Sequence, residues 1–282
     1  MATTEVKKIK RQILVLFDFS KTSENALLHG IKLSQVLKSS LTIVFPLIKT
    51  MKDDDRASLK QSLGNRIAQL NAETSIEIQA FAPDKKIKSF YRALYEKVEG
   101  IIYLIGIEDG KFACGIGMRL FLKMVRNSKI PWMSVPHDAP VNAYTHVVLP
   151  LSYNRQVKEK IAWASYFHRL NQSAIHALAP KAKDGFIKIG IYKNTEFLKK
   201  MYSSLDVYYK LIPTEKNIHE IDDYALQYAV EHNAAPVIIL VTPNPDIFDL
   251  LFGATERKLI MNNNQIPVLC INPLDDMYVV CS

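Results

Sequence analysis

The sequence predicts an α/β protein made of two tandem repeats, each a five-stranded parallel sheet with helices on both faces. Two observations support this prediction. Short apolar runs alternate with longer stretches of helical periodicity, which is the order of strands and helices in a covered parallel sheet. The order of elements in the first half of the chain then returns in the second half.

The first buried strand organises the rest of the chain. Residues 13–16 are apolar without interruption, as in a strand that is covered on both faces. Asp18 and Ser20 follow, just before an amphipathic stretch. Because an open parallel sheet binds ligands at the carboxyl ends of its strands, Asp18 is a candidate ligand-binding residue. Its alternative role is to cap the next helix or to end a solvated loop.

The remaining elements of the first half follow in order. A helix is expected over residues 22–38, because small and apolar residues recur on one side and Ser20 or Thr22 can cap it. Another should open at Asp53-Asp54-Asp55, since carboxylates favour a helix start; a metal site is the alternative for this acidic run. Further strands are expected at residues 41–45, 75–81, 101–105 and 131–135, and further helices at 86–97 and up to about 128.

The second half starts again after a proline-containing linker near residues 137–143. Strands are expected at residues 147–151, 173–178, 206–212, 236–241 and 267–271, and helices within 159–170, 187–205 and 218–233. Gly190 weakens the helical pattern of the second of these helices. We therefore divide the chain into domains at residues 1–138 and 144–282, each long enough for a core of its own.

An internal repeat supports this division. A shift of 136 residues carries Ile130-Pro131 onto Ile266-Pro267 and, without a gap, Ile102 onto Ile238. Proline is tolerated at the first residue of a strand, so both Ile-Pro pairs mark the same boundary. Chance agreement between two strand–helix–strand units is the alternative. With only two copies of a long period, duplication indicates a pair of domains and not a solenoid.

Composition excludes several classes of function. The chain of 282 residues has a formal charge of +8, but its lysines are scattered, so nucleic acid is not an expected partner. No apolar stretch reaches the about 18 residues that span a bilayer, so no membrane contact is expected. Three cysteines without metal or redox spacing and an N-terminus without an apolar core make the cytoplasm the expected location.

No catalytic motif is present, and the chain is not expected to be an enzyme. The seven histidines lack metal-ligand spacing, and no Walker loop or Gly-x-Ser-x-Gly elbow occurs. His29 and His168 fall on expected helices and are interpreted as surface or half-buried residues. Glu220, Asp222 and Asp223 cluster at a helix start, where carboxylates favour the dipole. No metal site is predicted.

The two halves resemble the universal stress protein family in its tandem form. The resemblance rests on Ile13 to Ser20 with Ser23 to Leu27, and on the closing strands that begin at Ile130-Pro131 and Ile266-Pro267. It covers about residues 10–136 and 144–273. It implies the open, flavodoxin-like sheet of the adenine-nucleotide hydrolases in each domain, and dimer-like pairing of the domains through their last strands.

The resemblance also implies a place for ATP or another adenine nucleotide in the first domain. In members that bind ATP, an acidic residue after the first strand contacts the nucleoside and glycines hold the phosphates, because their backbone N–H groups come close to the anion. The matching residues of this chain are Asp18, Phe19, Ser20, Val44, Gly106, Gly110 and Gly117.

The phosphate loops depart from the family pattern. Asp109 stands where a second glycine is expected, and Met118 follows Gly117 where a hydroxyl is expected. In the second domain the counterpart of Asp18 is about Leu151, Thr242-Pro243-Asn244-Pro245 replaces the glycine loop, and Gly253-Ala254-Thr255 is the nearest remnant of the helix-opening turn. The second domain is therefore not expected to bind ATP.

Two hypotheses of function follow. The first is a non-catalytic tandem universal stress protein, which acts as a stress-response scaffold or partner-binding module with eroded ATP-binding loops. The second is an adenine-nucleotide-binding sensor with one site in the first domain. A nucleotide hydrolase is a weaker third. A further homodimer and an unidentified protein partner are also expected.

Overall fold

The computed structural model describes residues 12–46, 53–82, 100–241 and 256–273. The first half contains β1 (Gln12–Leu16), α1 (Lys21–Val36), β2 (Ser40–Val44), α2 (Asp53–Glu73), β3 (Ile78–Phe81), β4 (Ile102–Glu108), β5 (Lys111–Phe112), the 3₁₀ turn η1 (Ala113–Gly115), β6 (Ile116–Gly117), α4 (Met118–Arg126) and β7 (Trp132–Pro136). The second half contains β8 (His146–Pro150), α5 (Val157–Asn171), β9 (Ala174–Ala179), α6 (Gly185–Ser204), β10 (Tyr209–Pro213), α7 (Ile221–Glu231), β11 (Val237–Leu240) and β12 (Val268–Ile271), and residues 256–260 are also helical.

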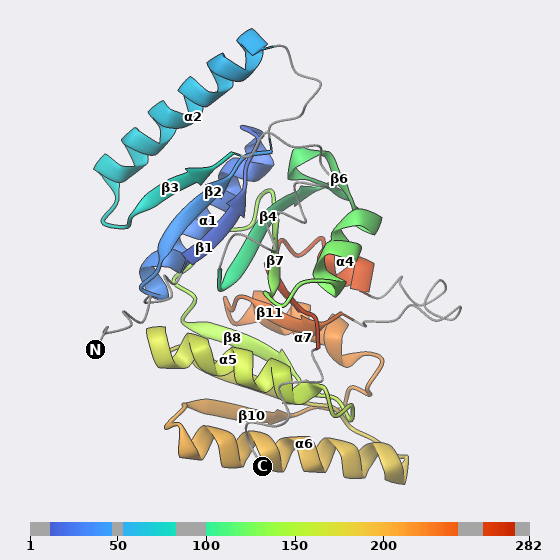
Figure 1. The fold of residues 1–282 in the computed structure, drawn as a ribbon. Coiled ribbons are helices and arrows are strands. Elements are labelled where there is room, and N and C mark those ends of the chain that lie inside the picture. The colour runs from blue at the N-terminus through green and yellow to red at the C-terminus, as the bar shows by residue number, and fades with distance from the viewer. Residues whose placement is uncertain (1–11, 47–52, 83–99, 242–255, 274–282) are drawn as a thin grey trace, which may run out of the picture.

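One sheet runs through both halves. Its main strands have the order β10-β9-β8-β11-β12-β7-β4-β1-β2-β3, so each half has the same internal strand order and its own strands are parallel. The halves meet where β12 pairs antiparallel with β7, with Leu269 opposite Met133. The predicted α/β class and the mostly parallel sheet are thus confirmed, and Figure 1 shows the sheet with its helices on both sides.

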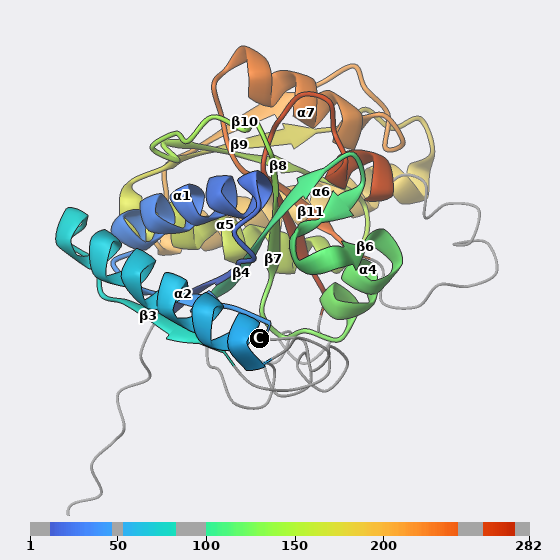
Figure 2. The ribbon, with the colours of Figure 1, turned by 90° about the horizontal axis from the view of Figure 1, so that it is seen from above.

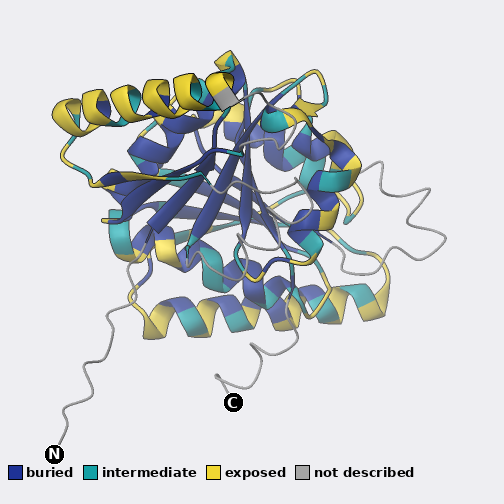
Figure 3. Cartoon of the chain, turned by 45° about the horizontal axis from the view of Figure 1, so that its top comes forward, coloured by how far each residue is buried: buried dark blue, intermediate teal, exposed yellow. Residues whose placement is uncertain are grey.

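The hydrophobic cores belong to the faces of the sheet. One core packs α1, α2, α5 and α6 against the strands, and the other packs α4, α7 and the helical residues 256–260 against the opposite face. Each core contains residues from both halves, so the two halves share their cores. The reason is the β7–β12 pairing, which makes each face continuous across the joint. Figure 3 shows the buried strands between exposed outer helix faces, and Figure 2 shows α1 and α2 side by side on one face.

Some boundaries differ from the prediction. β4 continues through Gly106 to Glu108, because Gly106 pairs with β7 and Glu108 gains a partner in β5. β10 begins at Tyr209, since Asp206 has a positive φ of 52° and cannot lie in a strand. α6 continues through Gly190, where the missing side chain admits Tyr153, 2.8 Å from where a Cβ would lie. The helix predicted at residues 86–97 lies outside the described residues.

The gap-free shift of 136 is wrong for one pair of strands. Leu14 pairs with Tyr103, and its counterpart Val148 pairs with Val237, which corresponds to a shift of 134 residues. The closing strands keep the shift of 136, because Trp132 lies beside Tyr103 as Val268 lies beside Val237. The two shifts differ by an even number of residues, so corresponding side chains still point to the same face of the sheet. The apolar pattern of the repeat is therefore the same with either shift.

The linker between the halves is held by side chains from both of them. From α1, Asn25 Nδ2 donates to the carbonyl oxygens of Pro136 (2.9 Å) and Ala139 (3.2 Å). His29 contacts the hydroxyl of Tyr144 through Nδ1 (2.5 Å) and the Ala139 oxygen through Nε2 (3.1 Å). From the second half, Ser173 Oγ donates to the Tyr144 oxygen at 2.7 Å. The linker is therefore a fixed part of the core.

The expectation that His29 and His168 are surface or half-buried residues is wrong. His29 is fully buried on α1, and His168 is buried on α5. His168 Nδ1 contacts the Ser173 oxygen at 3.0 Å, and its Nε2 accepts a hydrogen bond from the Tyr208 amide at 3.3 Å. Both rings replace water by internal partners, which is why helix periodicity alone placed them wrongly.

Replacing Tyr144 by Phe is expected to lower the free energy of unfolding by about 1–3 kcal/mol, because a buried His29 nitrogen loses its partner. Urea denaturation measures the effect. Tyr192→Phe is the matched control, since its side chain is exposed and should change little. Equal stabilities of the two variants would contradict the role given to the linker contact.

Stability should fall as the pH drops from about 6.5 to about 4. Burial lowers the pKa of His29 to about 4, against a hydrogen bond to Ala139 that raises it, so the folded state holds the neutral ring. The stabilisation is therefore present above the unfolded pKa of about 6.5 and is lost on acidification, at a cost of about 3 kcal/mol. Urea denaturation at several pH values should give a shallower slope for His29→Gln in this window. An unchanged slope would contradict the assignment.

Candidate functional site

The predicted site lies where β1 leads into α1. Ser20 is the N-cap of α1, and its hydroxyl accepts a hydrogen bond from the Ser23 amide at 3.2 Å. Phe19 has a positive φ of 64°, and its ring packs edge-on against Phe17 and Phe45. The turn is thus fixed by a helix cap on one side and by aromatic packing on the other.

Both oxygens of the Asp18 carboxylate bind groups of the chain itself. Oδ1 accepts from the Ser20 amide (3.1 Å) and the Ser20 hydroxyl (2.5 Å). Oδ2 accepts from the Cys114 amide at 2.6 Å. Asp18 therefore fastens a segment almost a hundred positions later to the start of α1.

The hydrogen bonds set the charge of Asp18. Burial alone would raise the pKa of its carboxyl group, but the hydrogen bonds from Ser20, the Cys114 amide and Ser23 outweigh burial and hold the pKa below its ordinary value. Asp18 is thus ionised at neutral pH. Burial, with the Asp18 charge, raises the pKa of the Cys114 thiol, so this cysteine stays protonated and is a poor nucleophile.

A short hairpin stands where the phosphate loop was expected. Asp109 and Gly110 both have positive φ, as a two-residue type I′ turn requires, and β5 pairs antiparallel with β4 on one side and β6 on the other. Phe112 stacks on Phe121 with ring centroids 4.2 Å apart, and Ile116 is buried. The hairpin therefore closes over the end of β4 with its own small apolar contact.

Gly106 lies inside β4 and does not end the strand as predicted. A Cβ at this position would lie 2.1 Å from the carbonyl oxygen of Thr22. Glycine is required at this position because α1 packs directly on the strand. This packing explains the glycine without a bound ligand.

The other predicted residues are also placed by packing. Gly110 serves the hairpin turn and faces the Met261 side chain from the second half. Gly117 is the N-cap of α4 and has open space around it. Val44 is fully buried at the end of β2, where its carbonyl oxygen accepts from the Phe17 amide at 3.0 Å. The structure brings Asp18, Phe19 and Ser20 together, and Val44 lies in the core below them.

A second polar group at the start of α1 was not predicted. Thr22 Oγ1 donates to Glu108 Oε2 at 3.0 Å, and His137 Nε2 lies 3.5 Å from Glu108 Oε1. Asp138 lies 2.7 Å from the same His137 nitrogen and 3.3 Å from Lys21 Nζ. A carboxylate thus occupies the helix end that would attract a phosphate.

Sequence signals for these contacts were uneven. The Asp109-Gly110 pair between apolar residues is a strong hairpin signal, and it could have revealed that the loop is a turn. The Cys114 contact goes through a backbone amide, which leaves no mark on residue types. Glu108 belongs to β4 only because the strand is longer than predicted.

The segment after β8, which corresponds to the segment after β1, has different residues at the matching positions. Gln12 pairs with Ser40 and His146 pairs with Ala174, so matching these pairs carries Asp18 onto Ser152, one residue after the predicted Leu151. Leu151 itself is fully buried. The prolines at residues 242–245 and the remnant at residues 253–255 lie outside the described residues.

A buried lysine fills this second corner. Lys160 Nζ donates to the Pro150 oxygen at 2.6 Å, at the end of β8, and its side chain is almost fully buried. Burial lowers the pKa of Lys160, while the negative charge of Asp222 acts in the opposite direction. Asp222, at the start of α7 as predicted, therefore favours the charged form of Lys160.

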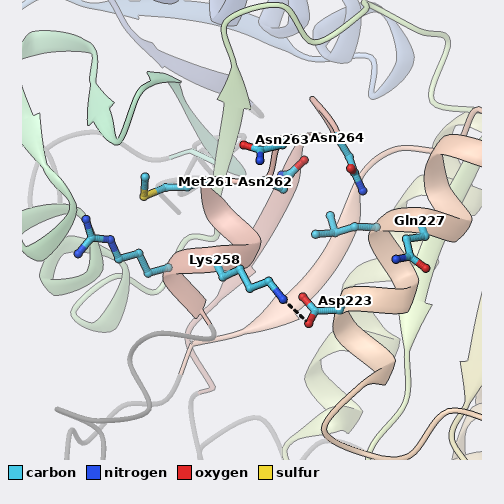
Figure 4. Close-up of a pocket in the computed structure, with 9 residues that line it drawn as sticks. Asp223, Gln227, Lys258, Met261, Asn262, Asn263 and Asn264 are labelled. Carbon is cyan, nitrogen blue, oxygen red and sulfur yellow. Dashed lines mark hydrogen bonds and ion pairs between the residues drawn. The ribbon is translucent and has the colours of Figure 1, made fainter.

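The rest of the described chain holds no metal-ligand cluster but does contain cavities. Within the described ranges, no group of three His, Cys, Asp or Glu residues is arranged to hold a metal ion. A cavity of about 600 Å³ lies between α7 and residues 257–264 (Figure 4). Lys258 Nζ and Asp223 Oδ2 form an ion pair across it at 2.6 Å. None of the predicted site residues lines this cavity.

Comparison with known proteins identifies the fold. No family model and no curated protein matches the sequence. Among solved structures, a universal stress protein from Archaeoglobus fulgidus DSM 4304 matches with a TM-score of 0.71 and 12% identity, over 93% of this chain and 98% of that one. A putative universal stress protein from Pseudomonas aeruginosa UCBPP-PA14 matches with a TM-score of 0.60 and 14% identity, over 95% of both chains. A protein of unknown function from Pseudomonas aeruginosa PAO1 gives 0.59 and 15%, over 95% and 94%.

Gly106→Ala is expected to lower the free energy of unfolding by about 3 kcal/mol, because the new methyl group overlaps the Thr22 backbone. Gly117→Ala should cost about 1 kcal/mol or less, since nothing lies within 4 Å of its Cβ. Thermal and urea unfolding without any nucleotide measure both. Similar losses in the two variants would refute the packing role of Gly106.

Proposed function

We propose that this chain, which has the fold of the universal stress proteins, is a tandem member of that family that acts without catalysis, as a stress-response scaffold or partner-binding module. The proposal is supported by the matched fold over nearly the whole chain and by the state of the two corners where a nucleotide would bind.

The use of Asp18 carries the proposal. Its carboxylate is occupied on both oxygens, by Ser20 and by the Cys114 amide. A nucleoside would have to share this carboxylate with the Cys114 amide, beside the hairpin that packs on Phe121. Asp18 thus keeps the residue type of the family motif, but its hydrogen bonds hold parts of the fold together.

Electrostatics at the start of α1 point the same way. Glu108 binds Thr22 in the first turn of the helix, and its carboxylate follows Gly106 by two residues on β4. Two like charges 4 Å apart repel by about 1 kcal/mol even in water, and by more where water is excluded. A triphosphate would therefore meet negative charge where a binding site needs donors.

A scaffold role fits the arrangement of the halves. The β7–β12 pairing and the buried linker hold the halves in one fixed relation, which is suited to presenting surfaces to a partner. In this proposal the protein acts in the cytoplasm, pairs further as a homodimer and binds a protein partner.

The alternative function is an adenine-nucleotide sensor in the first half. One observation favours it: Asp18, Phe19 and Ser20 are only half-buried, so this turn is accessible from solvent. In that case the hairpin would move when the nucleoside takes the place of the Cys114 amide. A nucleotide hydrolase has no such support, because the described corner holds neither a metal cluster nor an activated nucleophile.

Isothermal titration calorimetry with ATP and Mg²⁺ separates the two functions. The scaffold predicts no binding heat at millimolar ATP. Micromolar binding that is lost in Asp18→Asn and kept in Ser152→Ala, the equivalent position of the second half, would replace the scaffold by the sensor. Mass spectrometry of small molecules that co-purify with the native protein extends the test to ligands other than ATP.

A further inference from the structure

The outward face of α6 is apolar where a surface helix is normally polar. The helix buries Ile191, Leu198 and Tyr202 against the core. On the opposite side, Phe186 is 76% exposed, Ile189 56% and Tyr192 65%. Their spacing of three residues keeps them on neighbouring positions of one helix surface.

This apolar face lies at the border of the molecule. α6 forms the outermost layer of the second half, and its outer side is exposed (Figures 1 and 3). Residues 185–190 are exposed or half-exposed all round the helix. Phe186 rests edge-on against Tyr153, itself 41% exposed, with ring centroids 6.1 Å apart. The aromatic group therefore projects from the surface with support from below.

A collar of lysines surrounds the apolar face. Six lysines and no arginine lie in residues 181–200: Lys181, Lys183, Lys188, Lys193, Lys199 and Lys200. Asp184 is used as the N-cap and accepts from the Ile187 amide at 2.9 Å. Glu196 pairs with Lys199, and Lys181 pairs with Glu215. The other four lysines form no ion pair within the part of the chain that the structure describes.

We propose that this face of α6 lies on an anionic membrane surface. Aromatic and aliphatic side chains flanked by lysines are the composition of a helix that rests in the headgroup region of anionic lipids. Lysine is depleted from protein interfaces, where arginine is preferred. A second copy would place like-charged lysine collars against each other.

The proposal goes beyond the scaffold role and needs no transmembrane segment. In the described residues no helix is long and apolar enough to cross a bilayer, and a face that lies on the surface requires none. The absence of a long apolar run led us to expect no membrane contact, but a three-residue exposed face does not require such a run. The formal charge of +8 also favours a negative surface.

Co-sedimentation of the full chain with vesicles tests the proposal. Vesicles of phosphatidylcholine with phosphatidylserine should bind the protein, and vesicles of phosphatidylcholine alone should not. The double variant Phe186→Ser and Ile189→Ser should reduce binding about tenfold or more, through loss of inserted apolar groups. Lys188→Glu with Lys193→Glu should reduce it similarly.

Matched controls separate this face from general charge and from unfolding. Val230→Ser removes an equally exposed apolar group on α7, and Lys123→Glu reverses an exposed charge on α4; both should leave binding unchanged. Circular dichroism and thermal unfolding confirm that each variant is folded.

Three outcomes would overturn the proposal. The first is no sedimentation with either vesicle. The second is sedimentation that the α6 variants do not weaken more than the controls do. The third is concentration-dependent self-association in sedimentation velocity that Phe186→Ser abolishes while vesicles do not bind, which would make this face a contact between copies. Because none of these results involves ATP, they are independent of the calorimetric test of the scaffold role.

Discussion

The antiparallel pairing of β7 with β12 is the constraint on which the rest of the structure depends. Each of these strands would otherwise be the edge of a five-stranded sheet, with unpaired backbone groups and an uncovered apolar border. Pairing them satisfies those groups and lets the side chains on each face continue into the other half. The shared cores and the buried linker, with His29 and Tyr144 in contact, are consequences of this joint.

Contacts within the chain also use the polar groups at the carboxyl ends of β1 and β8, where a nucleotide would bind. In the first half, the carboxylate of Asp18 and the glycines at positions 106 and 110 are engaged in holding a helix, a strand and a hairpin together. In the second half, the ammonium group of Lys160 binds the carbonyl oxygen of Pro150 at the end of β8. A motif can thus keep its residue types when they hold the fold together and bind no ligand. Only the contacts of these residues distinguish a structural role from a binding role.

The sequence predicted the fold better than the contacts around the candidate site, for physical reasons. Buried parallel strands are uninterrupted apolar runs, so the first strand at residues 13–16 and the closing strands could be located from residue types alone. The extension of β4 to Glu108 depends in part on pairing with β5, a two-residue strand that periodicity does not reveal. The depth of His29 depends on a linker carbonyl and a hydroxyl more than a hundred residues away. Such contacts are set by tertiary structure, which local patterns cannot encode.

Covalent fusion also permits asymmetry. In a dimer of identical subunits every surface occurs twice, so a feature gained by one helix is gained by its mate. Here α2 and α6 occupy equivalent positions, each between the second and third strands of its half, yet α2 is polar on its outer side while α6 displays Phe186 and Tyr192. The two ends of the molecule therefore differ. A partner that binds one end has a single binding site per chain and binds it in one orientation.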